Sequence, residues 1–314
     1  MQGKINTLQD KQYIDNISKD LLNPIFSSMV TRDMIGPIRK VEVDSMYYIR
    51  DRGYSFEQKF NLNTKGILNK KVLDYKLPEE KAEIPLMFFN GSLTRDGRKL
   101  IVATHAARFM IKPDDEPNME NKYDVDALDF QTFFKNQKAE NLSMLTALRM
   151  NATFPFVLPN IELPSTPVVD VMDGGLRDNF GHETTLRFID IFQSWLKENT
   201  SKVVMIEIRD RPIDDWERPF ETTSILSLLT KPMLLLQNNW FKLQDYYQKN
   251  EINYMLDAME PQLYKVGFSY EPAQKTIAAS LSFHLTASEK KDLAASLNNE
   301  NNQKAFKDIL ELSK

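Results

Sequence analysis

The chain has 314 residues, of which 42% are hydrophobic and 27% charged, and its formal net charge is −4. These values are typical of a globular protein with enough chain to bury a core. A nucleic-acid binder would usually show a basic excess, so we expect no nucleic acid as a partner. The sequence contains no cysteine, which excludes disulfides, thiolate metal sites and a cysteine nucleophile.

No targeting or membrane-spanning segment is evident in the sequence. The first residues, Met1 to Asn6, are polar and lack the apolar core of a signal peptide. The densest apolar stretch, Met233 to Leu236, is far shorter than the roughly 18 residues of a spanning helix. Localisation is therefore left open between the cytoplasm and a membrane reached through a longer parent protein.

The first third of the chain predicts helices followed by two strands. Apolar residues at three- and four-residue spacing predict a helix over 8–34, broken or kinked at Asn23-Pro24. Aromatic residues favour a second helix over 45–62. Two short apolar runs, 84–90 and 99–104, are separated by an Asp-Gly turn and predict two strands joined by a loop.

The segment from Asp114 to Asp129 is acidic, which raises the possibility of a calcium loop. Asp124, Asp126 and Asp129 would supply its ligands. However, Leu128 occupies the position of a further acidic ligand, and the required glycine is missing. A surface loop explains the composition better, and we expect no metal site. A short helix over 142–150 should follow.

Residues 168–208 give the clearest pattern, that of a strand, a helix and a second strand. A Val-rich strand over 168–172 is followed by a loop over 173–182, a helix over 184–199 and an apolar strand over 203–208. This order predicts a βαβ unit with a right-handed crossover. The helix should bury five apolar residues along one stripe: Leu186, Ile189, Phe192, Trp195 and Leu196.

The last third is expected to be mostly helical. Residues 222–264 are rich in leucine, glutamine and aromatic residues, and 305–312 should form the closing helix. Thr286 and Glu289 have the spacing of a capping box before another helix. Three aromatic residues are expected to pack in the interior, although exposure would make them candidates for docking on a membrane: Trp216, Trp240 and Phe241.

The motif that could carry chemistry is Asp173-Gly174-Gly175, directly after the strand over 168–172. Ligands of open α/β sheets bind beyond the carboxyl ends of strands, where a carboxylate can act as a base. The two glycines permit positive φ angles and a close approach of the backbone. By itself the tripeptide is also a good loop former without any chemistry.

The surroundings of this motif resemble patatin-like lipid acyl hydrolases of the bacterial type. Ala147 to Pro159 is similar to the helix, small residues and Phe-Pro segment that precede the catalytic aspartate in that family. Val169 to Gly181 is similar to the aspartate motif with its downstream asparagine, and Asp20 to Pro37 to the region after the nucleophile helix. The resemblance extends from about residue 15 to residue 210.

The resemblance implies a three-layer α/β/α fold with a mainly parallel central sheet, in which the N-terminal strands and the nucleophile elbow are missing. It implies a partial patatin-like domain over 1–215 and a mainly helical extension over 216–314. In that family a Ser-Asp dyad cleaves lipid esters without a cofactor. Asp173 would be the catalytic base, and Gly174, Gly175 and Asn179 would bind the substrate. The partner would be a lipid or ester substrate, including one at a membrane surface.

The sequence departs from the family at the nucleophile. It contains no Gly-x-Ser-x-Gly and no glycine-rich oxyanion loop, and its only Gly-Ser pair, Gly91-Ser92, lacks the elbow pattern. We therefore expect the chain to be catalytically incomplete. Its partner would be a missing N-terminal segment, or a second copy of the chain if it self-associates. His182 could join Asp173 in a catalytic triad with a serine. The better interpretation is that His182 is a polar residue at the start of a helix. The alternative is a non-catalytic patatin-like interaction or regulatory protein.

Overall fold

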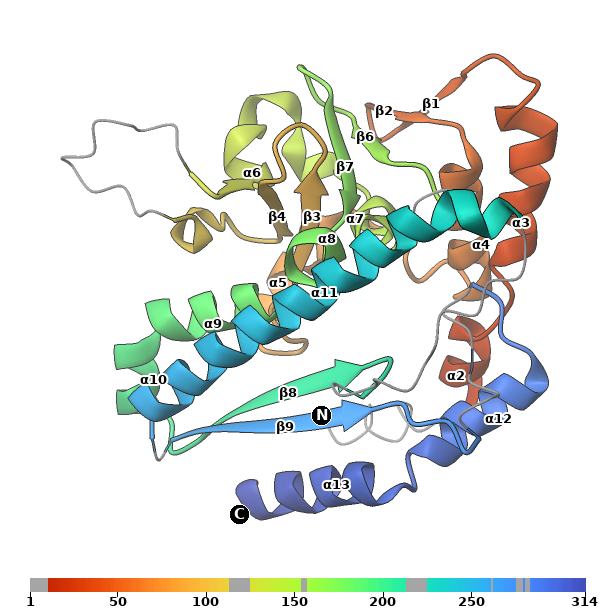
Figure 1. Cartoon of the computed structure of the whole chain (residues 1–314). Coiled ribbons are helices and arrows are strands. Elements are labelled where there is room, and N and C mark those ends of the chain that lie inside the picture. Colours follow the sequence, from red (N-terminus) through yellow and green to blue (C-terminus); the bar gives the residue numbers. More distant parts are fainter. Residues whose placement is uncertain are drawn as a thin grey trace. The chain divides into compact units, whose positions relative to one another are not determined.

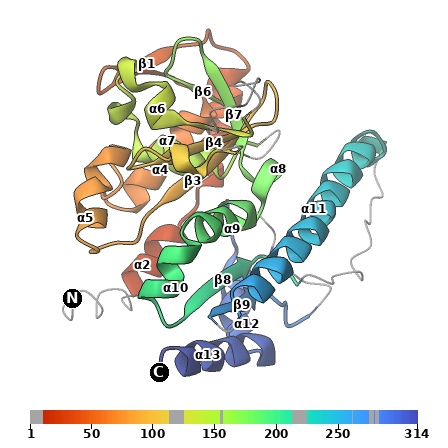
Figure 2. The same cartoon turned by 90° about the vertical axis from the view of Figure 1, so that its left-hand side faces the viewer.

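The computed structural model describes residues 11–112, 125–153, 157–212, 225–260, 262–274, 279 and 283–314. The chain divides into two compact units, Met1–Arg177 and Asp178–Lys314. Each unit is described by itself below (Figures 1 and 2). The domain boundary expected from the sequence, between residues 215 and 216, lies outside the described residues.

The first unit is built on a five-stranded mixed sheet with the order β5-β4-β3-β7-β6 (Figure 1). Its strands are β3 (Phe88–Leu93), β4 (Lys99–Ala103), β5 (Ala127–Asp129), β6 (Ile161–Leu163) and β7 (Val169–Asp173). Only β4 and β5 pair in parallel, whereas the other three neighbouring pairs are antiparallel. The α/β class is thus confirmed, but the expectation of a mainly parallel sheet is wrong here. The connections between β3 and β4 and between β6 and β7 are hairpin loops. They are too short to form the crossover that two neighbouring parallel strands need.

The first unit also contains several helices, short 3-10 turns and a separate hairpin. The helices are α2 (Lys11–Ile17), α3 (Leu22–Ser28), the π-helical turn η1 (Met29–Asp33), α4 (Arg52–Asn63), α5 (Lys76–Glu80), α6 (Phe130–Phe133) and α7 (Met144–Met150). Short 3-10 turns are η2 (Val72–Tyr75), η3 (Arg108–Met110), η4 (Lys135–Gln137) and η5 (Ala139–Asn141). The hairpin consists of β1 (Lys40–Val43) and β2 (Met46–Ile49).

Two of the helices expected near the N-terminus differ from the prediction. The helix over 8–34 is broken before Pro24, because Asp20 accepts the backbone N–H of Leu22 at 3.1 Å at the start of α3. Pro24 fits within the first turn, where a helix has no partner for its N–H groups. The helix over 45–62 begins only at Arg52. Asp44 and Ser45 both have positive φ and form the tight turn of the β1–β2 hairpin instead.

The core of the first unit lies on the face of the sheet that α6 and α7 cover. Side chains from every strand except β5 are buried in it, together with residues of η2 and η5. Its fully buried members include Val72, Leu100, Val102, Phe130, Leu142, Ala147, Met150 and Val171. The sheet thus presents one strongly apolar face, and the end of β7 lies at its margin.

The second unit contains the parallel strands β8 (Val203–Arg209) and β9 (Leu263–Ser269), joined by the long helix α11 (Ile225–Ala258). Its other helices are α9 (His182–Ile191), α10 (Gln193–Asn199), α12 (Ala287–Ser296) and α13 (Glu300–Leu312). Both views show α9 and α11 on one side of the strand pair and α13 on the other (Figures 1 and 2). A βαβ unit is therefore present, but it is β8-α11-β9.

The expected βαβ unit, with β7 as its first strand, is wrong for a topological reason. Both neighbours of β7, which are β3 and β6, pair with it antiparallel, so no edge of β7 remains for β8. The apolar strand expected over 203–208 is present as β8 and pairs in parallel, but its two isoleucines are not buried. Ile206 and Ile208 are 51% and 76% exposed, whereas Glu207 and Arg209 are buried.

Several predictions for the second unit can be checked residue by residue. Thr286 and Glu289 form the expected capping box of α12. The helix over 184–199 is divided at Phe192 into α9 and α10, and Trp195 is 57% exposed rather than buried. Trp240 is 52% exposed, and Trp216 lies outside the described residues. Within the described ranges, no helix combines the length and the apolar character needed to cross a bilayer.

Candidate functional site

Asp173 is the last residue of β7, which is the position expected from the sequence. It pairs with Gly91 in the neighbouring antiparallel strand β3. Because side chains alternate along strands, Asp173 leaves the same face of the sheet as Val171, which is fully buried in the core. A carboxylate that is only partly exposed is thus held at the margin of an apolar face.

The carboxylate of Asp173 is held by one of its two oxygens. The backbone N–H of Gly175 donates to Oδ1 at 2.7 Å, and Oδ2 has no hydrogen bond among the residues that the structure describes. Burial raises the pKa of Asp173, while the hydrogen bond from Gly175 acts in the opposite direction. A carboxyl with a raised pKa and one unengaged oxygen has the properties of a general base.

A close contact rather than an unusual backbone angle requires glycine at position 174, next to Asp173. A Cβ on Gly174 would lie 2.4 Å from the backbone oxygen of Asn90, a distance that no side chain tolerates. Gly175 begins α8 (Gly175–Asp178), whose first turn includes the N–H that Asp173 accepts. Among the described glycines, positive φ occurs at Gly66, Gly97 and Gly181, so the expected left-handed conformation is not the reason for this pair.

Asn179 belongs to the second compact unit. There its backbone N–H donates to Oε1 of Gln244 at 3.2 Å. The candidate site of the first unit therefore consists of Asp173, Gly174 and Gly175.

His182 also belongs to the second unit, as the first residue of α9. The expectation of a polar residue at a helix start is confirmed. Its Nδ1 lies 3.0 Å from Oε1 of Gln248, and its Nε2 lies 2.9 Å from Oε1 of Glu207. Both ring nitrogens thus face acceptors in a buried polar cluster.

Ser92 is not placed to serve as a nucleophile for Asp173. It lies one residue beyond Gly91 in β3 and is opposite Met172, so its side chain leaves the other face of the sheet. Ser92 is 3% exposed, and its Oγ has no hydrogen-bond partner in the described part of the chain. The structure therefore agrees with the sequence in offering no serine elbow at this motif.

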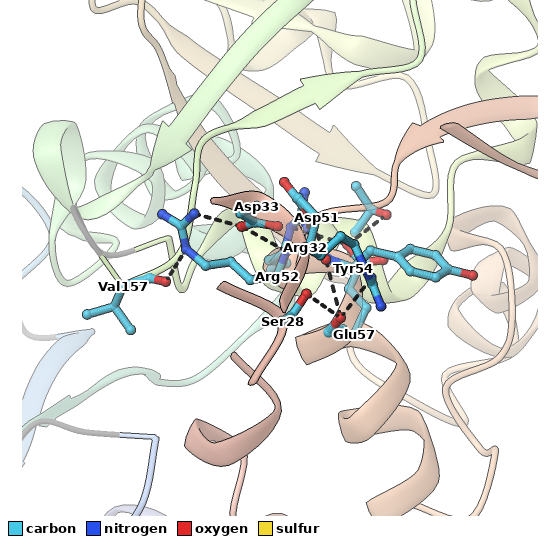
Figure 3. Close-up of polar contacts among 11 residues, drawn as sticks. Ser28, Arg32, Asp33, Asp51, Arg52, Tyr54, Glu57 and Val157 are labelled. Carbon is cyan, nitrogen blue, oxygen red and sulfur yellow. Dashed lines mark hydrogen bonds and ion pairs between the residues drawn. The ribbon is translucent and has the colours of Figure 1, made fainter. Parts of the chain in front are cut away.

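A buried ionic network that sequence reasoning missed fixes α7, the helix before the Phe-Pro segment. Nε of Arg149 lies 3.2 Å from Oε1 of Glu57, and NH1 lies 3.5 Å from Oδ1 of Asp51. Thr146 donates to Oε1 of Glu57 at 3.2 Å. Figure 3 shows Glu57 and Asp51 on α4 and the turn before it. A Cβ on Gly53 would lie 2.1 Å from Arg149, so glycine gives the guanidinium its space.

Burial dominates the electrostatics of this network. It raises the pKa of Glu57, against the opposite effects of the Arg149 charge and the Thr146 hydrogen bond. The one sequence signal was Arg149 itself, a charge inside the otherwise apolar run of α7, since a buried charge requires a partner. The partners could not be identified because they lie roughly ninety residues earlier in the chain.

Metal ligands do not converge in the described ranges. No group of three or more histidine and carboxylate side chains there could hold an ion. In the acidic segment considered for calcium, Asp129 instead accepts the backbone N–H groups of Ala107 and Gln131, and Asp124 lies outside the described residues.

Comparison with known proteins gave no match. No family model, curated protein or solved structure matched the chain. The geometry around Asp173 and the chemistry of its neighbours are therefore the basis for the functional argument.

Proposed function

We propose that this chain is part of a patatin-like lipid acyl hydrolase and supplies the aspartate of its Ser-Asp dyad. The observation that carries the proposal is the state of Asp173. One carboxylate oxygen is fixed by the N–H of Gly175, the other is unengaged among the described residues, and burial raises the pKa. The patatin-like three-layer architecture is part of the same proposal.

The chemistry follows from this arrangement. Oδ2 of Asp173 would take the proton from a serine hydroxyl as the serine oxygen attacks the ester carbonyl. The same carboxyl would return the proton to the departing alcohol and then activate water to hydrolyse the acyl-serine. Gly174 and Gly175 would keep the turn free of side chains where the ester approaches. The chain contains no Gly-x-Ser-x-Gly, so the serine of this dyad is not among its 314 residues.

The proposal is tested first by reading the coding sequence upstream of Met1. We expect an in-frame Gly-x-Ser-x-Gly and a glycine-rich loop. The extended protein should hydrolyse p-nitrophenyl esters, and Asp173→Asn should abolish that activity. Asp170→Asn is the matched control, because Asp170 lies on the same strand but bonds to Thr94 and Asn160.

Two results would overturn the proposal. One is an extended protein without the serine motif or without activity, which would favour a non-catalytic interaction or regulatory role. The other is strong hydrolysis by the 314-residue chain alone that Asp173→Asn abolishes, because a different nucleophile would then exist. The pH profile adds a further check: kcat/KM should fall as the pH drops through the raised pKa of Asp173, since only the ionised carboxylate accepts a proton.

A further inference from the structure

The N-terminal helices carry a row of exposed apolar side chains that we call the exposed apolar patch. It consists of Phe26, Val30, Met34, Ile35 and Ile38, which are 52%, 56%, 70%, 79% and 82% exposed. The first three are spaced by four residues along α3 and η1, so they lie on one side of the helical path. The row continues into the turn before β1.

The inward face of this segment is partly polar. Ser28, Arg32 and Asp33 turn inward onto α4, as Figure 3 shows, alongside the buried Ile25, whereas the polar residues Ser27 and Thr31 are exposed. Asp33 forms an ion pair with Arg52 at 2.8 Å, and Ser55 hydrogen-bonds to Ser28 at 3.1 Å and to Arg32 at 3.3 Å. A helix normally buries its apolar stripe and exposes its polar one. Outward apolar side chains held in place by inward polar contacts indicate a surface meant for an apolar environment.

Two backbone N–H groups in the turn at the end of the patch are hydrogen-bonded within the chain. The N–H of Met34 donates to the backbone oxygen of Met29 at 3.0 Å, and the N–H of Gly36 donates to the backbone oxygen of Arg32 at 2.7 Å. Pro37 has no N–H. A segment that enters a lipid interface benefits from backbone groups that are satisfied internally, and two N–H groups of this turn are satisfied in this way.

Two cations follow the apolar residues directly. Arg39 and Lys40 are exposed, and neither forms an ion pair within the described residues. They adjoin Ile38, the most exposed member of the patch. Apolar side chains next to unpaired cations complement a surface that has an apolar interior and an anionic rim.

We propose that the exposed apolar patch docks on an anionic lipid surface, with Met34, Ile35 and Ile38 entering the headgroup region and Arg39 and Lys40 contacting lipid phosphates. The apolar residues project from a turn, a shape suited to insertion into a fluid layer. The choice of lipid over a protein partner rests in part on the proposed function. Docking would bring the unit that carries Asp173 to the surface where a lipid ester is found.

The test is flotation of the full chain with vesicles of phosphatidylcholine alone and of an equimolar mixture with phosphatidylglycerol. We expect binding to the anionic vesicles that weakens with added salt. Arg39→Gln/Lys40→Gln should lower the partition coefficient roughly 30-fold. Ile35→Ser/Ile38→Ser should lower it on the order of a hundredfold, because two apolar side chains no longer insert.

Matched controls are available in the same unit. Leu62→Ser/Ile67→Ser removes two side chains that are 70% and 56% exposed, and Lys81→Gln/Lys135→Gln removes two exposed cations. Both control variants should bind vesicles like the unaltered chain.

Three outcomes would overturn the docking proposal: no vesicle binding by the unaltered chain, equal loss in patch and control variants, or self-association that the patch variants abolish without vesicle binding. Asp173→Asn should bind vesicles normally, so a failure of docking and a failure of the dyad are distinguished by separate measurements.

Discussion

In the second unit, Nε2 of His182 lies 2.9 Å from Oε1 of Glu207, and both side chains are almost completely buried. Lys265 and Arg209 also contact Glu207, at 2.8 and 2.7 Å, and Arg209 continues to Asp245 at 2.6 Å. Glu207 is thus the centre of a buried cluster that joins α9, β8, β9 and α11. Burial alone would raise the pKa of Glu207, but these three partners together hold it well below its ordinary value.

Replacing Glu207 should destabilise the second unit strongly. Glu207→Gln keeps the shape but removes the counter-charge of Lys265 and one of the two carboxylates that contact the buried Arg209, which should cost about 3 kcal/mol of unfolding free energy. All three tryptophans of the chain, Trp195, Trp216 and Trp240, lie in this unit, so tryptophan fluorescence during urea unfolding reports on it. Glu251→Gln, at an exposed position on α11, is the control and should change the unfolding free energy by less than about 0.5 kcal/mol. Equal effects of the two changes would contradict a central role for Glu207.

The same cluster predicts a specific sensitivity to acid. The folded-state pKa of Glu207 is lowered from 4.5, so its contribution to stability is complete above that value and is lost as the pH falls toward the lowered pKa. Fluorescence-detected unfolding should therefore show stability decreasing below pH 4.5. The decrease should be smaller in Glu207→Gln. A variant with the same acid dependence as the unaltered chain would assign that dependence to other carboxylates.

Local features of the fold could be predicted from the sequence because their causes are local. The Asp-Gly turn between β3 and β4 and the capping box of α12 each depend on residues within a few positions of one another. Which side chains of β8 are buried could not be predicted from neighbouring residues in the sequence. Its sequence suggests that isoleucines face the core, whereas the long-range cluster draws Glu207 and Arg209 inward and leaves Ile206 and Ile208 exposed.

At the candidate site, too, local features could be predicted from the sequence and long-range contacts could not. The place of Asp173 at the end of a strand follows from the Val-rich run and the Gly-Gly pair after it. The requirement for glycine at position 174 does not follow from the local sequence. The backbone oxygen that a Cβ there would meet belongs to Asn90, more than eighty residues earlier. The sequence suggested backbone flexibility, but the structure shows a steric limit imposed by a strand whose pairing is not encoded locally.

Gly174→Ala should therefore be poorly tolerated. The new methyl group would lie 2.4 Å from the oxygen of Asn90, so β3 and the Asp173 turn would have to separate. Forced displacement of this kind typically costs about 1–3 kcal/mol. Calorimetry of the full chain measures the loss. Gly267→Ala is the control, because its nearest neighbouring atom is 3.9 Å away, and it should unfold like the unaltered chain. A neutral Gly174→Ala would show that the turn can move freely.

The network of Arg149 and Glu57 should show strong coupling between the two residues. Arg149→Met leaves Glu57, which is 4% exposed, without its cation, which should cost about 3–5 kcal/mol at neutral pH. Replacing both, in Arg149→Met/Glu57→Leu, should recover most of that loss. Urea unfolding of the two single variants and the double variant gives the coupling energy. Additive single effects would mean that the pair does not interact.

The pH dependence of Arg149→Met gives an independent check. Glu57 already has a raised pKa in the folded protein, and the loss of Arg149 removes one of the influences that lower it. A carboxyl with a raised folded-state pKa favours the folded state below its unfolded pKa and loses that contribution as the pH rises. The variant should therefore be relatively more stable in mild acid than at neutral pH, and the double variant should not show this difference.

Asp173→Asn should separate stability from activity at the candidate site. Burial raises the pKa of Asp173, so ionisation of this carboxyl opposes folding, and its contribution to stability is lost as the pH rises through the folded-state pKa. Asparagine retains an oxygen for the N–H of Gly175 but carries no charge, so we expect a gain on the order of 1 kcal/mol at neutral pH. The gain should vanish in acid, where Asp173 is already protonated. Calorimetry across pH measures it, with Asp170→Asn as the control. A loss of stability at neutral pH would indicate that the charge of Asp173 serves the fold, which would remove the main support for its role as a catalytic base.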